Sequence, residues 1–174
     1  MKTLRVLSRL EENPTHSKII ESLKVIPPGS VFFVLPSVES NKRVSLFSPL
    51  TKICRAGIYL GGGKSAAFSV EKGKVVKRPF TEFLYGDVSV FWYTKATVKQ
   101  LQQLKSFLYD YAKPVEYATS VDLVTDAVNA SDWPWVTFGK KQKTMSEVLA
   151  WLESDKARNK YWEQVWVLLL NSDK

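Results

Sequence analysis

Two of the side chains best suited to nucleophilic and general-base chemistry occur once each in this chain of 174 residues: Cys54 and His16. A thiol paired with a histidine base is an effective nucleophile, because imidazole accepts a proton near neutral pH. One cysteine and one histidine cannot supply the ligand spacings of a zinc, haem or thiol-redox site. We therefore expect no cofactor, and no metal site unless carboxylates provide it.

Two other patterns invite a chemical interpretation. Asp122 and Asp126 lie four residues apart, on one face of an expected helix, and could serve acid–base chemistry or a weak cation site. Solvated surface is the more common role of such a pair. Gly61, Gly62 and Gly63 belong to no phosphate-binding motif and follow a strand pattern, so they predict a hairpin turn with positive φ angles.

Positive charge is the main compositional signal. The chain has 25 Lys and Arg against 17 Asp and Glu, a net charge of +8, which favours anionic partners such as nucleic acid, acidic polymers or lipid head groups. Many basic residues fall in expected loops, and Lys140, Lys141 and Lys143 follow the aromatic pair Trp133 and Trp135. A scattered solubilising surface explains the same residues, since no nucleic-acid motif accompanies them.

The hydrophobic pattern predicts the elements that must position these side chains. Leu4, Leu7 and Leu10 suggest an amphipathic N-terminal arm, and Thr97 is an expected N-cap. Trp162 and Trp166, four apart in a strand, should share one face and lie in the core. We expect strands near residues 30–35, 55–60, 65–70, 74–77, 87–93 and 161–170, and helices near residues 17–24, 81–84, 97–113, from 120, and 144–152.

Strands mixed with helices around one continuous core predict a single α+β domain, an antiparallel sheet packed against helices. Residues 1–27 form the expected arm and short helix, and residues 28–174 the domain. The apolar run at residues 165–170 is far below the roughly 20 residues that span a bilayer, so no transmembrane segment is expected. Arg5, Ser8 and Arg9 interrupt the first apolar stretch, which argues against a secretory signal and for a cytoplasmic protein.

An ordered set of segments resembles the permuted, YiiX-like branch of the NlpC-type, papain-like cysteine hydrolases, from about Pro28 to Leu170. The set comprises residues 28–33 (PGSVFF), 56–64 (AGIYLGGGK), 75–83 (VVKRPFTEF), 122–124 (DLV) and 144–149 (TMSEVL) with the Trp-rich strand that follows. The resemblance implies the permuted papain-like arrangement of the sheet and helices.

The resemblance also implies where catalytic groups would lie, and the residues there differ. The family histidine precedes the Gly-Ile-Tyr segment, where this chain has Arg55. The family cysteine opens a Cys-Ser-Glu-Leu-Val helix, where this chain begins with Ser120. The third polar position falls on Ala67 or Phe68. Arginine has no lone pair to accept a proton, so Ser120 beside Arg55 would be inert.

A nucleophile or base at a position other than that of the family is less well supported by the sequence. Cys54 adjoins the family histidine position, so strand alternation turns it away from the cleft, and a buried structural cysteine is the simpler interpretation. His16 lies before the first strand of the resemblance, where a solvent-facing helix residue is expected.

The sequence therefore predicts a catalytically inactive domain that binds protein partners in an assembly, with a possible anionic polymer or nucleic acid as ligand. The expected binding residues are Arg55, Tyr59, Ser120, Lys140, Lys141 and Lys143. Because relatives occur in bacteria, phages and large DNA viruses, the resemblance suggests a structural, virion-associated role. Two alternatives stay open: an active hydrolase or acyltransferase on peptide, peptidoglycan or lipid bonds through Ser120 or Cys54, and a basic nucleic-acid-binding protein.

Overall fold

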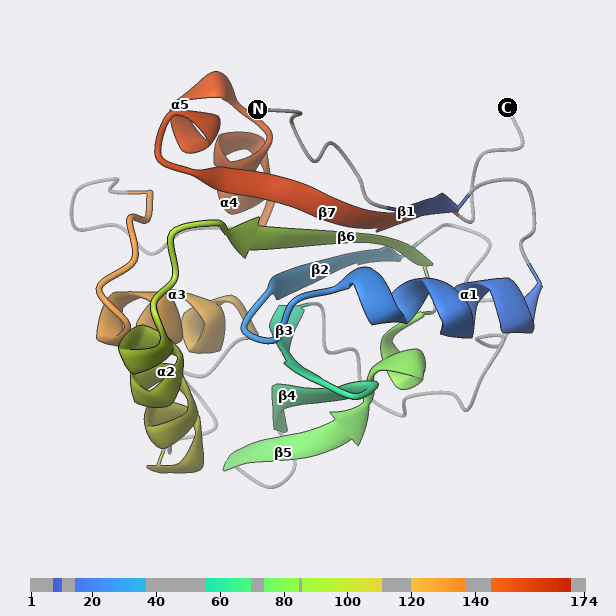
Figure 1. Ribbon diagram of the computed structural model, residues 1–174, viewed down its shortest axis with the longest axis horizontal. Helices are drawn as coiled ribbons and strands as arrows, with labels where there is room; N and C mark the ends of the chain where they lie inside the picture. Colours follow the sequence, from blue (N-terminus) through green and yellow to red (C-terminus); the bar gives the residue numbers. More distant parts are fainter. Residues whose placement is uncertain are drawn as a thin grey trace.

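One sheet organises the fold, as the computed structural model in Figure 1 shows. The structure describes residues 8–10, 15–36, 56–69, 74–84, 86–110, 120–136 and 145–169. Within these residues, seven strands form the sheet in the order β1-β7-β6-β2-β3-β4-β5. The strands are β1 (Ser8–Leu10), β2 (Val31–Pro36), β3 (Ala56–Gly61), β4 (Lys64–Ser69), β5 (Lys74–Pro79), β6 (Gly86–Tyr93) and β7 (Trp162–Leu168).

Every neighbouring pair in the sheet is antiparallel except β1 and β7, which run parallel. The expected mixture of a largely antiparallel sheet with helices is therefore confirmed. The helices among the described residues are α1 (His16–Ser22), α2 (Val98–Asp110), α3 (Ser120–Ala130), α4 (Met145–Leu152) and α5 (Asp155–Arg158), with 3₁₀ turns η1 (Leu23–Val25) and η3 (Phe80–Phe83).

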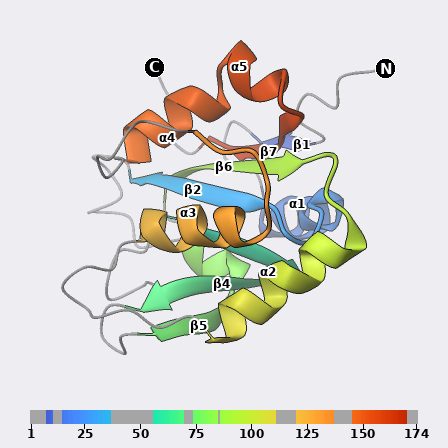
Figure 2. The same ribbon diagram turned by 90° about the vertical axis from the view of Figure 1, so that its left-hand side faces the viewer.

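Helices cover both faces of the sheet, so the protein has two cores (Figures 1 and 2). Helix α1 and turns η1 and η3 pack on one face, where Phe32, Val34, Tyr59, Phe80 and Trp166 belong to the buried cluster that we call the α1-side core. Helices α2, α3 and α4 pack on the other face, in the α3-side core, whose members include Val31, Phe33, Ile58, Leu104, Val124, Leu149 and Trp162. Successive residues of β2 thus alternate between the two cores, as strand geometry requires.

The glycines of the β3–β4 hairpin have the expected conformation. Gly61, Gly62 and Gly63 have φ angles of +94°, +60° and +77°, a region that residues with a Cβ adopt rarely. The Gly63 N–H donates to the Tyr59 hydroxyl at 2.9 Å, and the Gly63 carbonyl accepts from the Phe80 N–H at 2.7 Å. The glycines therefore form a turn that ties β3 to η3.

Helix α2 begins where the sequence predicts. The Thr97 hydroxyl accepts from the Gln100 N–H at 3.1 Å, and the Gln100 side chain accepts from the Thr97 N–H at 3.0 Å. This reciprocal pair is a capping box. Leu104 and Leu108 are buried, whereas Val98, the first residue of the helix, is 73% exposed.

The expected helical character of the N-terminal arm is wrong where the structure describes it. Residues Ser8–Leu10 form β1, which pairs with Trp166–Leu168 of β7. A three-residue spacing of leucines over ten residues is too short to fix a period. The open edge of β7 supplies backbone hydrogen bonds that favour a strand.

The two tryptophans of β7 are both buried but do not share a face. Val90 of β6 lies opposite Trp166, and Phe91 lies opposite Gln164, so Val165 is an extra residue in β7. Such a bulge shifts the alternation of side chains by one residue. Trp162 consequently enters the α3-side core and Trp166 the α1-side core, which corrects the expectation of a common face.

Candidate functional site

The strand that follows Arg55 and the helix that begins at Ser120 are neighbours in the fold. Helix α3 packs across β3, where Val121 and Val124 share the α3-side core with Ala56 and Ile58. Both segments lie in the middle of the molecule in Figure 2. Arg55 lies outside the described residues, and Ser120 is described only as the first residue of α3.

Tyr59, the other expected binding residue of this segment, lies on the opposite face of the sheet from α3. Its side chain is 2% exposed, and its ring packs edge-on against Phe80 with the ring centroids 5.2 Å apart. Its hydroxyl accepts the Gly63 N–H. The structure therefore gives Tyr59 a packing role in the α1-side core and does not bring its ring together with α3.

The chain's only histidine also lies on the side away from α3. His16 is the first residue of α1, whose N-cap is Thr15, with the Thr15 hydroxyl accepting from the Lys18 N–H at 3.3 Å. Ile19 and Leu23, which follow, are buried in the α1-side core. The sheet thus stands between the helix that carries His16 and the helix that begins at Ser120 (Figure 1).

The remaining family positions are placed by the sheet register. Ala67 lies opposite Val76, and Phe68 lies opposite Val75, in the β4–β5 pair next to β3. Asp122 and Asp126 are half-buried on α3, and Asp122 occupies the first turn, where a carboxylate stabilises the helix dipole. Among the described residues, no group of three or more His, Cys, Asp or Glu side chains is placed to hold a metal ion.

The expected basic and aromatic binding surface is corrected in one respect. Trp133 and Trp135 are 3% and 6% exposed and belong to the α3-side core, so their rings are not available as a surface platform. Cys54, Lys140, Lys141 and Lys143 lie outside the described residues.

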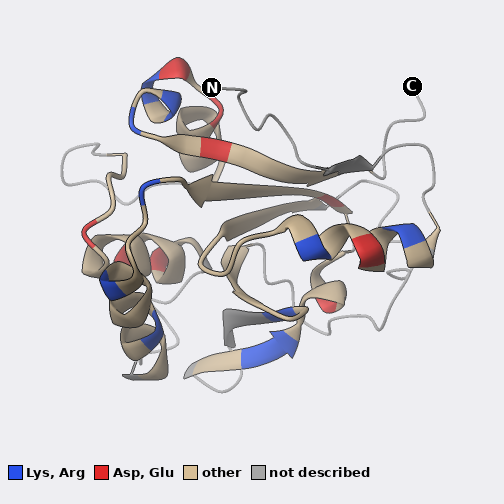
Figure 3. Cartoon of the chain, in the orientation of Figure 1, with Lys and Arg blue, Asp and Glu red and all other residues tan. Residues whose placement is uncertain are grey.

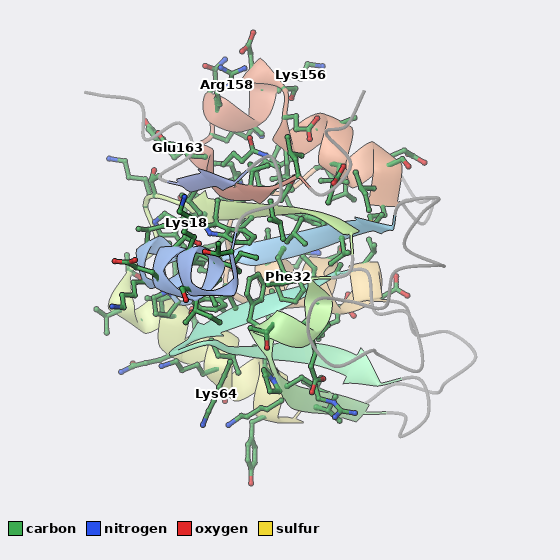
Figure 4. The ribbon with its side chains drawn as sticks, turned by 90° about the vertical axis from the view of Figure 1, so that its right-hand side faces the viewer. Lys18, Phe32, Lys64, Lys156, Arg158 and Glu163 are labelled. Atoms are coloured by element: carbon green, nitrogen blue, oxygen red, sulfur yellow. The ribbon has the colours of Figure 1, made fainter. Side chains whose placement is uncertain are left out.

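Basic residues within the described part of the chain are spread over several elements, with acidic residues beside them on α1 and α5 but none on β5 (Figure 3). Figure 4 shows Lys156 and Arg158 on α5, well apart from Lys18 on α1 and from Lys64 on β4. Arg158 pairs with Asp155 at 2.9 Å. The described basic residues are therefore distributed over several elements and are not gathered on a single one, whereas a nucleic-acid-binding protein usually clusters them on one face.

A depression of about 600 Å³, which the sequence did not indicate, lies at the opposite end of α3 from Ser120. Its walls come from the end of β6, the segment after α3 and the segment after α5. The lining residues are Tyr93, Asn129, Asp132, Trp133, Pro134, Asn159, Lys160 and Tyr161. No spacing rule links these three segments, so only the folded chain could bring them together.

Comparison with protein-family models, with curated proteins and with solved structures finds no match for this chain. Within the described residues, every helix is too short or too polar to cross a lipid bilayer.

Proposed function

We propose that this chain is a catalytically inactive, permuted papain-like domain of the NlpC type that acts as a binding or structural module, with protein partners in an assembly such as a viral or phage particle. The proposal draws on the resemblance of its segments to that family and on the packing of α3 across β3. Such packing is what a cleft between the residue before β3 and the start of α3 would need.

One observation supports the proposal that the domain is inactive. The chain's single histidine is the first residue of α1, which packs on the opposite face of the sheet from α3. A serine hydroxyl needs a neighbouring base within hydrogen-bond reach, about 2.6–3.2 Å. Helices that pack on opposite faces of a sheet are separated by the sheet and by the side chains on both of its faces, which is far more than this distance. The placement of α1 and α3 on opposite faces of the sheet supports the proposal that His16 does not serve as a base for Ser120.

Mechanism-based probes test the proposal directly. A fluorophosphonate labels activated serines, and a peptidyl vinyl sulfone labels activated cysteines. The wild-type chain, Ser120→Ala and Cys54→Ala should all remain unlabelled above the level of heat-unfolded protein. Labelling of the folded wild type that disappears in Ser120→Ala or in Cys54→Ala would show an active nucleophile and overturn the proposal.

The salt dependence of binding to duplex DNA tests whether the partner is a nucleic acid. Affinity for duplex DNA that falls steeply as sodium chloride rises would identify a nucleic-acid-binding protein, because phosphate contacts release counterions. We expect no such affinity, since the described basic residues are dispersed and partly paired with acids.

A further inference from the structure

We propose that the depression lined by Tyr93, Asp132 and Tyr161 is a binding site for a short, neutral oligosaccharide. This proposal does not rest on the proposed function, because the depression lies at the C-terminal end of α3. The 11 residues of that helix place it about 16 Å from Ser120.

Two strained residues meet at this depression. Asp132 and Tyr161, with φ angles of +57° and +67°, are the only described residues other than glycine with positive φ. Asp132 lies two residues after α3 and Tyr161 three residues after α5, and a positive φ favours glycine at either position. The Trp133 N–H donates to the Val128 carbonyl at 3.2 Å and the Asp132 N–H to the Asn129 carbonyl at 3.1 Å, which is the Schellman pattern.

Tyr161 is the more informative of the two, because bulky side chains are disfavoured at positive φ. Its ring is 52% exposed, so core packing does not explain why a tyrosine occupies a position suited to glycine. The Tyr161 carbonyl accepts from the Thr94 N–H at 2.9 Å and from the Thr94 hydroxyl at 3.1 Å, which fixes the backbone for any residue. Strained residues cluster at binding sites, and an exposed, fixed aromatic ring is suited to contact a ligand.

The ring also has a charged neighbour. The Lys95 ammonium lies 5.0 Å from the centroid of the Tyr161 ring, a cation–π contact. Beside it, the Tyr93 ring packs against Trp133 and Trp162, with centroids 5.7 Å and 5.6 Å apart. One wall of the depression is therefore aromatic, and the packing of Tyr93 against buried rings lowers the entropy that this part of the wall loses on binding.

The polar groups around the aromatic wall determine the class of ligand. Asn129, Asp132, Asn159 and Lys160 are all exposed at the surface of the depression. Together they offer two carboxamides that both donate and accept, one carboxylate acceptor and one ammonium donor, and the Lys95 ammonium beside the Tyr161 ring adds a further donor. A neutral ligand rich in hydroxyl groups, with an apolar face to stack on a ring, matches this set better than an anion or a cation. A pyranose has both properties.

Titration with defined sugars tests the inference. We would add cellotriose, maltotriose and chitotriose to the ¹⁵N-labelled full chain and follow amide shifts by NMR. At least one should bind with a Kd of about 1 mM, as a shallow and open site allows. The shifting amides should be those of residues 93, 129, 132, 133 and 159–161, and binding should not change between low and high salt because the ligand carries no charge.

Variants of Tyr161 separate binding from folding. Tyr161→Gly removes the ring and relaxes the backbone, so it should weaken binding at least tenfold while Tm stays the same or rises by a few degrees. Tyr161→Phe keeps the stacking face and should retain affinity within about threefold. Tyr109→Ala is the matched control, since Tyr109 is 88% exposed on α2 and does not line the depression.

Three outcomes would overturn the inference: no shift with any of the three sugars, shifts that persist in Tyr161→Gly, or binding at this site that requires a charged ligand. Because the readout is binding by a region remote from Ser120, none of these outcomes depends on whether nucleophile probes label the protein.

Discussion

At the residue scale, the buried tryptophans differ in whether the indole N–H has a partner. The Trp162 N–H donates to the Pro134 carbonyl at 2.7 Å, and the Trp166 N–H donates to the Ser22 hydroxyl at 2.9 Å. The indole N–H of Trp133, unlike its backbone N–H, is buried and has no partner among the described residues. A buried donor without an acceptor destabilises the folded state by about 1–3 kcal/mol.

Replacement by phenylalanine should therefore affect two adjacent tryptophans unequally. Trp162→Phe loses ring volume and leaves the Pro134 carbonyl without its donor, whereas Trp133→Phe loses ring volume and removes an unsatisfied donor. We expect Trp162→Phe to lower the free energy of unfolding by about 1 kcal/mol more than Trp133→Phe does. Urea titration measures both, and an equal or larger loss in Trp133→Phe would contradict this account.

Glycine positions give a second comparison at this scale. Gly29 has a φ angle of +92°, and a Cβ there would lie 2.7 Å from Leu101 and 3.3 Å from Trp92. Gly62 has a φ angle of +60° and open space around it.

We expect Gly29→Ala to destabilise the protein by about 2 kcal/mol, through strain and crowding, and Gly62→Ala by about 1 kcal/mol, through strain alone. Thermal unfolding of the two variants gives the comparison. If Gly62→Ala were the more damaging substitution, crowding at Gly29 would not be the cause.

At the element scale, the capping box of α2 is a local signal that sequence reasoning recognises. Thr97→Ala removes the hydroxyl that accepts the Gln100 N–H and should lower stability by about 1 kcal/mol. Gln102→Ala, an exposed change on the same helix, should have an effect within about 0.5 kcal/mol. Chemical denaturation distinguishes them, and equal effects would mean that the cap does not stabilise α2.

Features set by short-range patterns could be predicted from the sequence, whereas two features set by the pairing of β7 with its neighbours could not. The Gly61–Gly63 turn and the Thr97 cap depend on residues within four positions of one another, so their chemistry can be read locally. The bulge at Val165 depends on how β7 pairs with β6, and the strand at Ser8–Leu10 depends on the open edge of β7. The sequence of a strand does not show which strand pairs with it or in which register. For this reason the faces of Trp162 and Trp166, and the strand at Ser8–Leu10, differ from the prediction.

The candidate sites follow the same division. The resemblance predicts that β3 and α3 are neighbours. The face of the sheet on which Tyr59 lies could be assigned only once the register of β3 was known. The depression at Tyr161 joins three segments distant in sequence and depends on two backbone conformations that no residue pattern indicates.

At the scale of the whole molecule, β2 links the two cores. Phe32 and Phe33 are both fully buried, one in the α1-side core and one in the α3-side core. If the cores unfold together, Phe32→Ala and Phe33→Ala should each lower stability by about 3–5 kcal/mol and leave a single transition. Fluorescence and far-ultraviolet circular dichroism would then give coincident urea curves, and separate midpoints in either variant would show that one layer unfolds alone.

The parallel pairing of β1 with β7 has a consequence for biosynthesis. During translation, Ser8–Leu10 emerges from the ribosome long before its partner Trp166–Leu168, so the first strand of the sheet to be made is among the last to be incorporated. Until β1 docks, the outer edge of β7 offers unpaired backbone groups to any other extended chain. Until Ser8–Leu10 pairs with Trp166–Leu168, this edge of β7 is therefore open to misassociation.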